Sequence, residues 1–369
     1  MFIKTRGKNS LSILLLAVIV VLGLFSCNND NDEPTPSFER GPLLESVANN
    51  LIIPNFESLQ SSVDDLSEAT NTFVQTTTEE NLMTLRAAWV KAVTDHQHCS
   101  AFGFGPGELL LGPYAAVLGV FPVDEAQVEQ NMLNPDFDLP NSFDTDARGF
   151  YAVEYLIYGN GVTDADVISS FDQNRKDYLL LIVDELKTTF DNIVSEWNSS
   201  YAQEFIASDG TAAGSSISLY YNEFVKDYEN LKNFKLELPA GLTAGQTGVD
   251  GSLVEAFYSG ISRDLVVAHF ENSKNIWFGL SRTGEQIIGF EAYLETVVGG
   301  PELITLTKET ITQIDEAIAN LPQGRLSDNV ASNEVKIARD LLQANTANFK
   351  SSMSSLLGIS ITFNSGDGD

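Results

Sequence analysis

The helical spacing of apolar residues constrains the fold of this chain more than any other feature. In most segments these residues recur every three or four positions, which corresponds to one face of an α-helix. One stripe has the heptad-like register of helical bundles and comprises Leu179, Ile182, Val183, Leu186, Phe190, Ile193 and Trp197. Strand-like alternation is clear only over 359–363. The sequence therefore predicts an all-α protein.

The helices are expected between recognisable signals. Pro54 marks a kink or a helix start in the first stripe. Thr78, followed by two glutamates, starts a second helix. Later helices are expected over 124–132, 149–159, 217–234, 301–321 and 333–357. Composition turns small and polar over 208–214, where we place the junction between a first helical-bundle domain, 44–210, and a second, 211–369.

Residues 1–26 have the features of a lipoprotein signal peptide. A basic start precedes an apolar run, 11–25, that is short for a membrane span. The run ends in Leu-Phe-Ser-Cys27, which resembles a bacterial lipobox, so Cys27 is expected to become the lipidated N-terminus. A polar tether, 27–43, follows. Its acidic residues resemble the surface-export signal of Bacteroidetes lipoproteins, and a plain spacer is the alternative.

The charge of the mature chain limits its partners. Loss of the three cations of the signal peptide takes the net charge from −30 to −33. Such a surface repels phosphate backbones, so nucleic-acid binding is not expected, and membrane contact is expected through the lipid anchor alone. Cys99 would be the one remaining thiol, and it is expected to be a small buried hydrophobe.

A short helix that carries one acid in an aromatic run is the most informative stretch. It covers 149–159 and has a glycine at each end. Its tyrosines recur at i, i+4 and i+7 and so share one face: Tyr151, Tyr155 and Tyr158. Glu154 borders that face. Because an unpaired buried carboxylate is costly, we expect Glu154 on a wet edge or hydrogen-bonded to the phenols.

This stretch resembles the signature of the imelysin-like family, Gly-x-His-x-x-Glu followed by an aromatic residue and leucines. Gly149 and Glu154 match, whereas Tyr151 occupies the histidine position, so the motif is degenerate and reads GFYAVE. Upstream, the chain resembles the Trp-containing helix and the Glu-Ala-Phe-x-Phe-Gly-Pro turn of the family. The matching residues there are Trp89, Ala101, Phe102, Phe104, Gly105 and Pro106.

Two polar positions of that second motif are changed. Ser100 stands where the family has glutamate, and His96 stands where it has a large aromatic residue. The segments 255–262 and 275–279 resemble further family motifs, so the resemblance covers essentially the whole mature chain. It implies two four-helix-bundle-like domains packed together, with a site between them.

The family was classified as metallopeptidases because the motif histidine and glutamate could both face a metal. A catalytic zinc needs three protein ligands, and this motif offers Glu154 and Tyr151. Deprotonating a phenol at pH 7 costs about 4 kcal/mol, which zinc rarely repays, although ferric iron favours phenolate. Glu154 is therefore the single metal-ligand candidate. A hydrogen-bonded Tyr151–Glu154 pair at a domain interface is the structural alternative.

The histidines add one candidate. His96 shares a helical stripe with Ser100 and faces the expected site, whereas His98 is expected to be exposed. His269 lies in an amphipathic run and supports no hypothesis. Hydrolase elbows, phosphate loops and dinucleotide fingerprints are not found.

The lipobox predicts an outer-membrane lipoprotein, periplasmic or surface-facing, and the family resemblance implies a role in iron uptake. We expect it to be non-enzymatic, with no catalytic residue, and to bind a small ligand, a metal ion or an envelope protein. The cofactor stays open, with iron or another metal as candidates. The expected ligand-binding residues are Trp89, His96, Ser100, Gly149, Tyr151 and Glu154. A metallopeptidase and an interaction protein with a decayed site are the alternatives.

Overall fold

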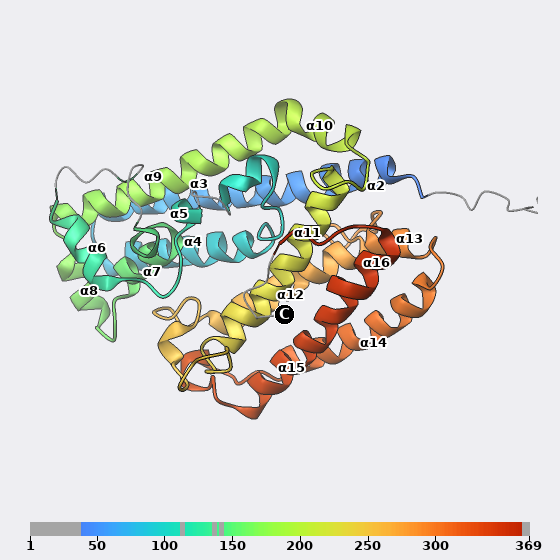
Figure 1. The fold of residues 1–369 in the computed structure, drawn as a ribbon. Coiled ribbons are helices and arrows are strands. Elements are labelled where there is room, and N and C mark those ends of the chain that lie inside the picture. The colour runs from blue at the N-terminus through green and yellow to red at the C-terminus, as the bar shows by residue number, and fades with distance from the viewer. Residues whose placement is uncertain (1–37, 111–114, 135–138, 140–143, 364–369) are drawn as a thin grey trace, which may run out of the picture. The chain divides into compact units, whose positions relative to one another are not determined.

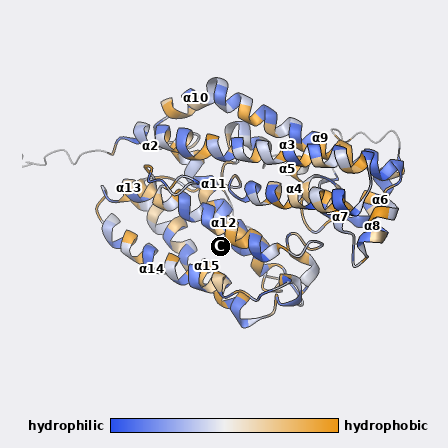
Figure 2. Cartoon of the chain, turned by 180° about the vertical axis from the view of Figure 1, so that it is seen from behind, coloured by the Kyte–Doolittle hydropathy of each residue, from blue (hydrophilic) through white to orange (hydrophobic). Residues whose placement is uncertain are grey.

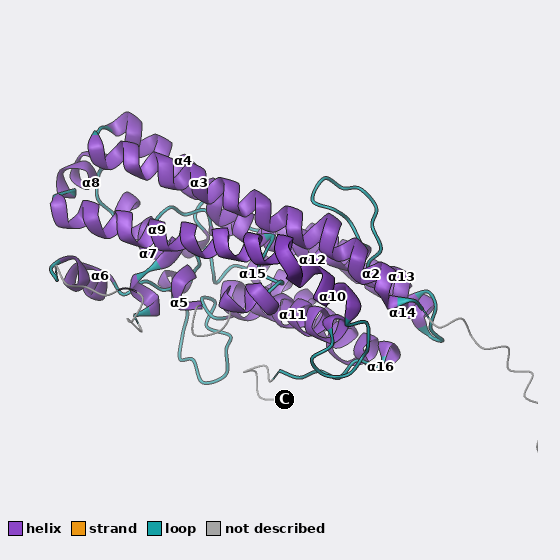
Figure 3. Ribbon diagram, turned by 90° about the horizontal axis from the view of Figure 1, so that it is seen from above, coloured by secondary structure: helices purple, strands orange, loops and turns teal. Residues whose placement is uncertain are grey.

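The computed structural model describes residues 38–110, 115–134, 139 and 144–363, and these are mainly helical (Figures 1 and 3). Within them, the strand-like pairing is a single antiparallel bridge between Leu280 and Gln286. The all-α prediction is therefore confirmed, and residues 359–363 form no strand. Residues from Phe38 onward form one compact unit. The predicted signal peptide and Cys27 lie outside the described residues.

The early helices pack around α3 (Ile53–Gln75). This helix lies along both α4 (Glu79–Gln97) and α9 (Gln173–Glu196), and the short α7 (Gly149–Tyr158) packs on α4 and α9. The predicted start at Thr78 is confirmed, because its hydroxyl accepts from the Asn81 N–H at the start of α4. Pro54 lies in the first turn of α3, where the π-helical segment Ala48–Ile52 continues into the α-helix, so it marks an irregularity in a longer helix and not a helix start. α6 (Glu125–Met132) and α8 (Asp164–Ser170) pack beside them.

The later helices are α11 (Ser216–Asn230), α12 (Ser262–Phe278), α14 (Gly300–Ala319) and α15 (Asn333–Ala347). α11 contacts α12 and α15, and α14 contacts α12 and α15. The last predicted helix, 333–357, continues from α15 through a π-helical segment, Asn348–Met353, into α16 (Ser354–Leu357). Most helices carry hydrophilic and hydrophobic residues together, as amphipathic helices do (Figure 2).

Short elements complete the described chain. α2 (Arg40–Val47) begins inside the predicted tether, because Leu43 and Leu44 are buried and order the backbone there. α5 (Ala115–Leu118), α10 (Ala202–Ala207) and α13 (Phe290–Leu294) are single or double turns. α2 contacts both α10 and α11, so it touches early and late helices alike.

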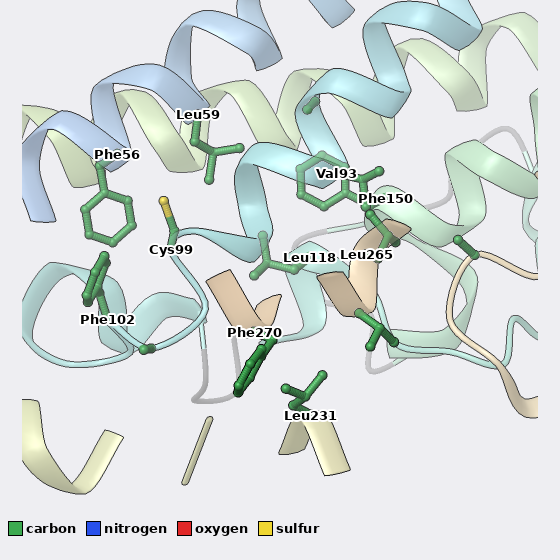
Figure 4. Packing of buried hydrophobic residues seen from close by; sticks show 14 of the residues in the cluster. Phe56, Leu59, Val93, Cys99, Phe102, Leu118, Phe150, Leu231, Leu265 and Phe270 are labelled. Atoms are coloured by element: carbon green, nitrogen blue, oxygen red, sulfur yellow. The ribbon is translucent and has the colours of Figure 1, made fainter. Parts of the chain in front are cut away.

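One hydrophobic cluster runs through early and late helices. Phe56 and Phe102 belong to the same cluster as Leu265 and Phe270 of α12 (Figure 4). Cys99 is fully buried in it, which confirms its predicted role as a small hydrophobe. α4 and α12 also contact each other directly. The domain boundary between 44–210 and 211–369 stays a prediction. A cavity, described below, lies where these two segments contact each other.

Candidate functional site

A cavity of about 330 Å³ lies at the junction of early and late helices. Residues from α4, α7, α11 and α12 line it, together with the π-helical turn Leu231–Glu237 that continues α11. A π-helical turn inserts an extra residue into the helical path and often occurs at functional sites. Here it carries Phe234 and Lys235, both of which line the cavity.

Two glycines allow the chain to pass close to itself at the cavity wall. Gly149 begins α7 with a φ of +67°, and a Cβ there would lie 2.0 Å from the carbonyl carbon of Leu118. Gly119 has a φ of +77°, and its Cβ would lie 2.1 Å from the carbonyl oxygen of Arg148. Leu118 and Gly119 line the cavity. The motif glycine Gly149 therefore shapes the wall through its backbone.

A strained turn brings Glu255 into the cavity from the segment before α12. The next residue, Ala256, has a φ of +53°, which a side chain disfavours. Arg325 holds this turn by donating hydrogen bonds to the carbonyls of Phe257 and Tyr258, and its guanidinium lies over the Phe257 ring. The Ser262 hydroxyl donates to the carbonyl of Glu255. These contacts fix the position of the Glu255 carboxylate.

Glu255 is the centre of a buried polar cluster. The Tyr151 hydroxyl donates to its Oε1 at 2.5 Å, and Gln97 Nε2 donates to the same oxygen at 3.1 Å. Lys235 Nζ lies 2.7 Å from Oε2 and also donates to Gln97 Oε1. Burial alone would raise the pKa of Glu255, but Lys235 and Tyr151 outweigh burial and hold the pKa below its usual value. Glu255 is thus a carboxylate with two donors on Oε1 and an ammonium beside Oε2.

The same carboxylate affects Tyr151. Burial, followed by the charge and hydrogen bond of Glu255, raises the pKa of Tyr151 well above its usual value. A phenolate at this position would lie against a carboxylate in a poorly solvated site. Tyr151 is therefore a hydrogen-bond donor in this cavity.

A second polar cluster lies on α11 and α12. Asp227 Oδ2 accepts from the Ser100 hydroxyl at 3.1 Å and lies 2.8 Å from His269 Nε2. Ser100 Oγ also lies 2.9 Å from the Gln97 carbonyl oxygen, which is a further acceptor for its one proton. Asp227 and His269 are both buried. The carboxylate thus stands between the hydroxyl and the imidazole.

His96 lies between the two clusters. Its ring packs against Phe150, and its Nδ1 is buried without a hydrogen-bond partner within the described part of the chain. Burial lowers the pKa of His96 to about 4, with Glu255 acting in the opposite direction. The imidazole is therefore neutral at physiological pH.

The cavity brings together three of the six predicted site residues by their side chains: His96, Ser100 and Tyr151. Trp89 is held elsewhere in the core, where its indole N–H donates to the Phe150 carbonyl at 2.8 Å. Glu154 lines an adjoining cavity of about 230 Å³ that shares Tyr151 and Phe121 with the first. A ligand-binding role for any of these residues stays a prediction.

Glu154 has a different hydrogen-bond partner from the one expected. Its Oε1 accepts from the backbone N–H of Ser259 at 2.7 Å, whereas the Tyr151 hydroxyl donates to Glu255. The prediction that a phenol donates to Glu154 is therefore wrong. The turn at Ala256 brings both the Glu255 carboxylate and the Ser259 N–H next to α7, so Tyr151 donates to Glu255 and Glu154 accepts from Ser259. Burial raises the pKa of Glu154 to about 7, although hydrogen bonds from Ser259 act in the opposite direction.

The expectation that His98 is exposed is wrong. His98 is buried at the end of α4, near the buried Asp95, to which Arg282 donates a hydrogen bond. Burial, followed by the charge of Arg282, lowers the pKa of His98 to about 4. The sequence places His98 at the polar end of a helix, but tertiary packing buries that end.

The donor chemistry of the cavity does not fit a resident metal ion. Within the described residues, no group of three or more histidine, cysteine or acidic side chains is placed to hold one. The donors on Glu255 come from Tyr151, Gln97 and Lys235, so a cation would have to displace an ammonium that is already in place. Glu154, the predicted metal candidate, instead accepts from a backbone N–H.

Sequence analysis missed six polar residues of the cavity: Gln97, Asp227, Asn230, Lys235, Glu255 and His269. A signal existed for two of them. Asp227 and His269 each occupy a position in the apolar stripe of their helix, where a polar side chain needs a partner. Glu255 begins a segment that resembles a family motif, but the motif alone indicates no role for this residue. For Lys235, the register shift of the π-helical turn is not evident from the sequence.

Comparisons with known proteins identify the family. The sequence profile of the peptidase M75 (Imelysin) family matches residues 52–353. Iron-regulated protein A of Synechococcus elongatus is 22% identical over 177 residues, which are 48% of this chain and 46% of that relative's length. The chain thus spans about half the length of the curated relative it matches.

Two crystal structures share the fold. One is an iron-regulated protein A precursor from Parabacteroides distasonis, with a TM-score of 0.72 and 17% identity over 90% of this chain and 97% of that one. The other is an imelysin-like protein from Psychrobacter arcticum, with a TM-score of 0.68 and 17% identity over 88% of this chain and 97% of that one. In the described part of the chain, no helix is long and apolar enough to cross a membrane. The profile match spans most of the sequence, and the chain therefore belongs to the Imelysin family.

Proposed function

We propose that this protein is a cell-envelope lipoprotein, anchored at the outer membrane through Cys27, that binds a small ligand in the cavity and serves iron uptake. The observation that carries the proposal is the composition of the cavity. Hydrogen-bonded polar groups form its inner part, and apolar side chains surround its mouth, where Phe234 is 51% exposed and Val120 is 39% exposed. Small-molecule sites are concave and mainly apolar, with a few fixed polar groups.

The iron-related part of the proposal is supported by the relatives. Two of them carry the name iron-regulated protein A. The lipoprotein part is supported by the sequence before residue 38, where the apolar run ends in Leu-Phe-Ser-Cys27. A surface-facing or periplasmic protein tethered at the outer membrane could hold a ligand close to the point of uptake.

The proposal holds that the protein does not catalyse a reaction. Ser100, Asp227 and His269 resemble the residues of a hydrolytic triad in type but not in order. In a triad the hydroxyl donates to the imidazole, which a carboxylate orients. Here the Ser100 hydroxyl reaches the carboxylate of Asp227 at 3.1 Å, so His269 is not placed to take its proton.

A growth experiment tests the function. A strain without the gene is complemented with the wild-type protein or with Asn230→Trp, which places a large ring at the cavity wall, and is grown with an iron chelator. Asn71→Trp, on the exposed face of α3, is the matched control. We expect the wild type and the control to restore growth and the cavity variant to fail while remaining folded and membrane-bound.

The other outcomes separate the alternatives. Full rescue by Asn230→Trp would contradict the ligand-binding proposal and favour an interaction protein with a decayed site. Cleavage of a mixed peptide substrate by purified protein, lost on Glu154→Ala at unchanged stability, would favour a metallopeptidase. Growth that depends on the gene equally with and without chelator would remove the link to iron.

A further inference from the structure

We propose that the cavity selects a small organic cation, an ammonium group attached to an aromatic or aliphatic body, with the ammonium on Asp227. The inference rests on the proposed ligand-binding function and specifies its ligand class. Three observations support it: the balance of charges in the cavity lining, the existing partners of those charges, and the apolar side chains at the cavity mouth.

The charge balance of the lining favours a cation. Among the described residues that line the cavity, two carboxylates, Glu255 and Asp227, face one fixed positive charge, Lys235. That ammonium is already bound by Glu255 at 2.7 Å and by Gln97. A carboxylate ligand would therefore find no free cation among these described lining residues and would approach Asp227 against its charge.

Asp227 has capacity left for a donor. Its contacts with Ser100 and His269 both reach Oδ2, and no hydrogen bond within the described residues reaches Oδ1. A carboxylate has about four acceptor sites, so one side of this group can still accept. The side chain is 5% exposed, and a charge-assisted bond is stronger in such a poorly solvated site than in water.

Two lining side chains, His96 and Tyr151, add no positive charge to the cavity. The imidazole of His96 is neutral, since burial lowers its pKa to about 4. The Tyr151 hydroxyl is directed to Glu255 and carries no charge. The net charge of the chain, −30, adds a long-range field that attracts cations and repels anions.

The mouth of the cavity fits the apolar body of such a ligand. Phe234 and Val120 are among the exposed large hydrophobic residues, and Phe121 packs edge-on against Tyr151 beside them. Exposed apolar side chains that surround a polar recess are a common arrangement in binding sites. The π face of Phe234 can also attract an ammonium group.

The first test uses three probes of matched size on the wild-type protein. These are 2-phenylethylammonium, neutral 2-phenylethanol and anionic 3-phenylpropanoate, titrated by calorimetry at pH 7. We expect the cation to bind with 1:1 stoichiometry and at least about tenfold more tightly than either analogue, a difference of about 1.4 kcal/mol. Equal or tighter binding of the anion or the alcohol overturns the inference. So does the absence of binding by the cation.

The second test uses variants. Asp227→Asn should weaken binding of 2-phenylethylammonium at least tenfold. Asp264→Asn, an equal charge change at an exposed carboxylate, should change that affinity less than twofold. If both variants lose the same affinity for the cation, the probe is attracted only by the net negative charge of the protein, and the inference fails. If Asp227→Asn does not fold, the three-probe comparison still decides.

A third variant separates this inference from the proposed function. Phe234→Ala should weaken the binding of all three probes. Val298→Ala, at a highly exposed apolar position away from the cavity, should weaken the binding of none. If the cavity binds the neutral probe best and binding depends on Phe234, the cation inference fails while the ligand-binding proposal stands. Growth rescue by Asn230→Trp would remove the proposed function itself.

Discussion

Replacing Lys235 by methionine removes the positive member of a buried ion pair and leaves its partner in place. The side chains of Lys235 and Glu255 are 7% and 3% exposed, and Nζ lies 2.7 Å from Oε2. Removing one member of such a pair costs about 3–5 kcal/mol because the other charge is left uncompensated. Tyr151 and Gln97 still donate to Glu255, so we expect a cost near the lower limit, about 3 kcal/mol at pH 7.

The stability cost of Lys235→Met should also depend on pH, and the pKa of Glu255 sets the direction of that dependence. In the wild type, burial would raise the pKa of Glu255, but Lys235 and Tyr151 hold it below 4.5. The pair thus adds stability that is present above about pH 4.5 and lost as the pH falls through the lower folded pKa. Without Lys235, burial dominates and raises the pKa. The cost of the substitution should therefore be largest near neutral pH and shrink as the pH falls toward about 4.

Denaturant unfolding, followed by circular dichroism at pH 7 and pH 4.5, measures these costs. Lys274→Met is the matched control, because Lys274 lies 2.7 Å from Asp315 in a pair whose side chains are 24% and 45% exposed. It should cost less than about 1 kcal/mol at either pH. Adding Glu255→Gln to Lys235→Met should recover part of the lost stability. A cost at pH 7 no larger than that of the control, or equal costs at both pH values, would refute the reasoning.

Three further predictions concern other parts of the molecule. Glu154→Gln should stabilise the protein above pH 7 by up to about 3 kcal/mol and have little effect at pH 4.5, because a carboxyl whose folded pKa is raised from 4.5 to about 7 loses stability as the pH rises between these values. Unfolding at both pH values measures it, and a gain at pH 4.5 would contradict it. Gly149→Ala should cost more than about 2 kcal/mol, whereas Gly161→Ala, which has the same φ of +67° but open space, should cost about 1 kcal/mol. Equal costs in denaturant unfolding would mean that close packing at Gly149 is unimportant. Cys27→Ala should move the protein from the detergent-extracted membrane fraction to the soluble fraction, and continued membrane retention would contradict the lipid anchor.

The local elements were predictable from the sequence because their causes are local. The stripe of α9, the threonine cap of α4 and the proline in the first turn of α3 depend on residues within a few positions of one another. The same holds for α7, whose flanking glycines and apolar run mark its limits. The motifs of the Imelysin family added the order of these elements. Of the predicted site residues, the fold places His96, Ser100 and Tyr151 around one cavity and Trp89 and Glu154 outside it.

The partners of these residues were decided by the tertiary structure alone. Tyr151 and Glu255 are 104 positions apart, and Gln97 and Lys235 are 138 apart, so no local pattern relates them. The strained turn at Ala256 and the π-helical register at Lys235 direct both side chains to the cavity. Helical periodicity fixes which face of each helix is buried. Which buried polar groups meet depends on how the helices pack, because a carboxylate removed from water takes whatever donors the packing brings to it.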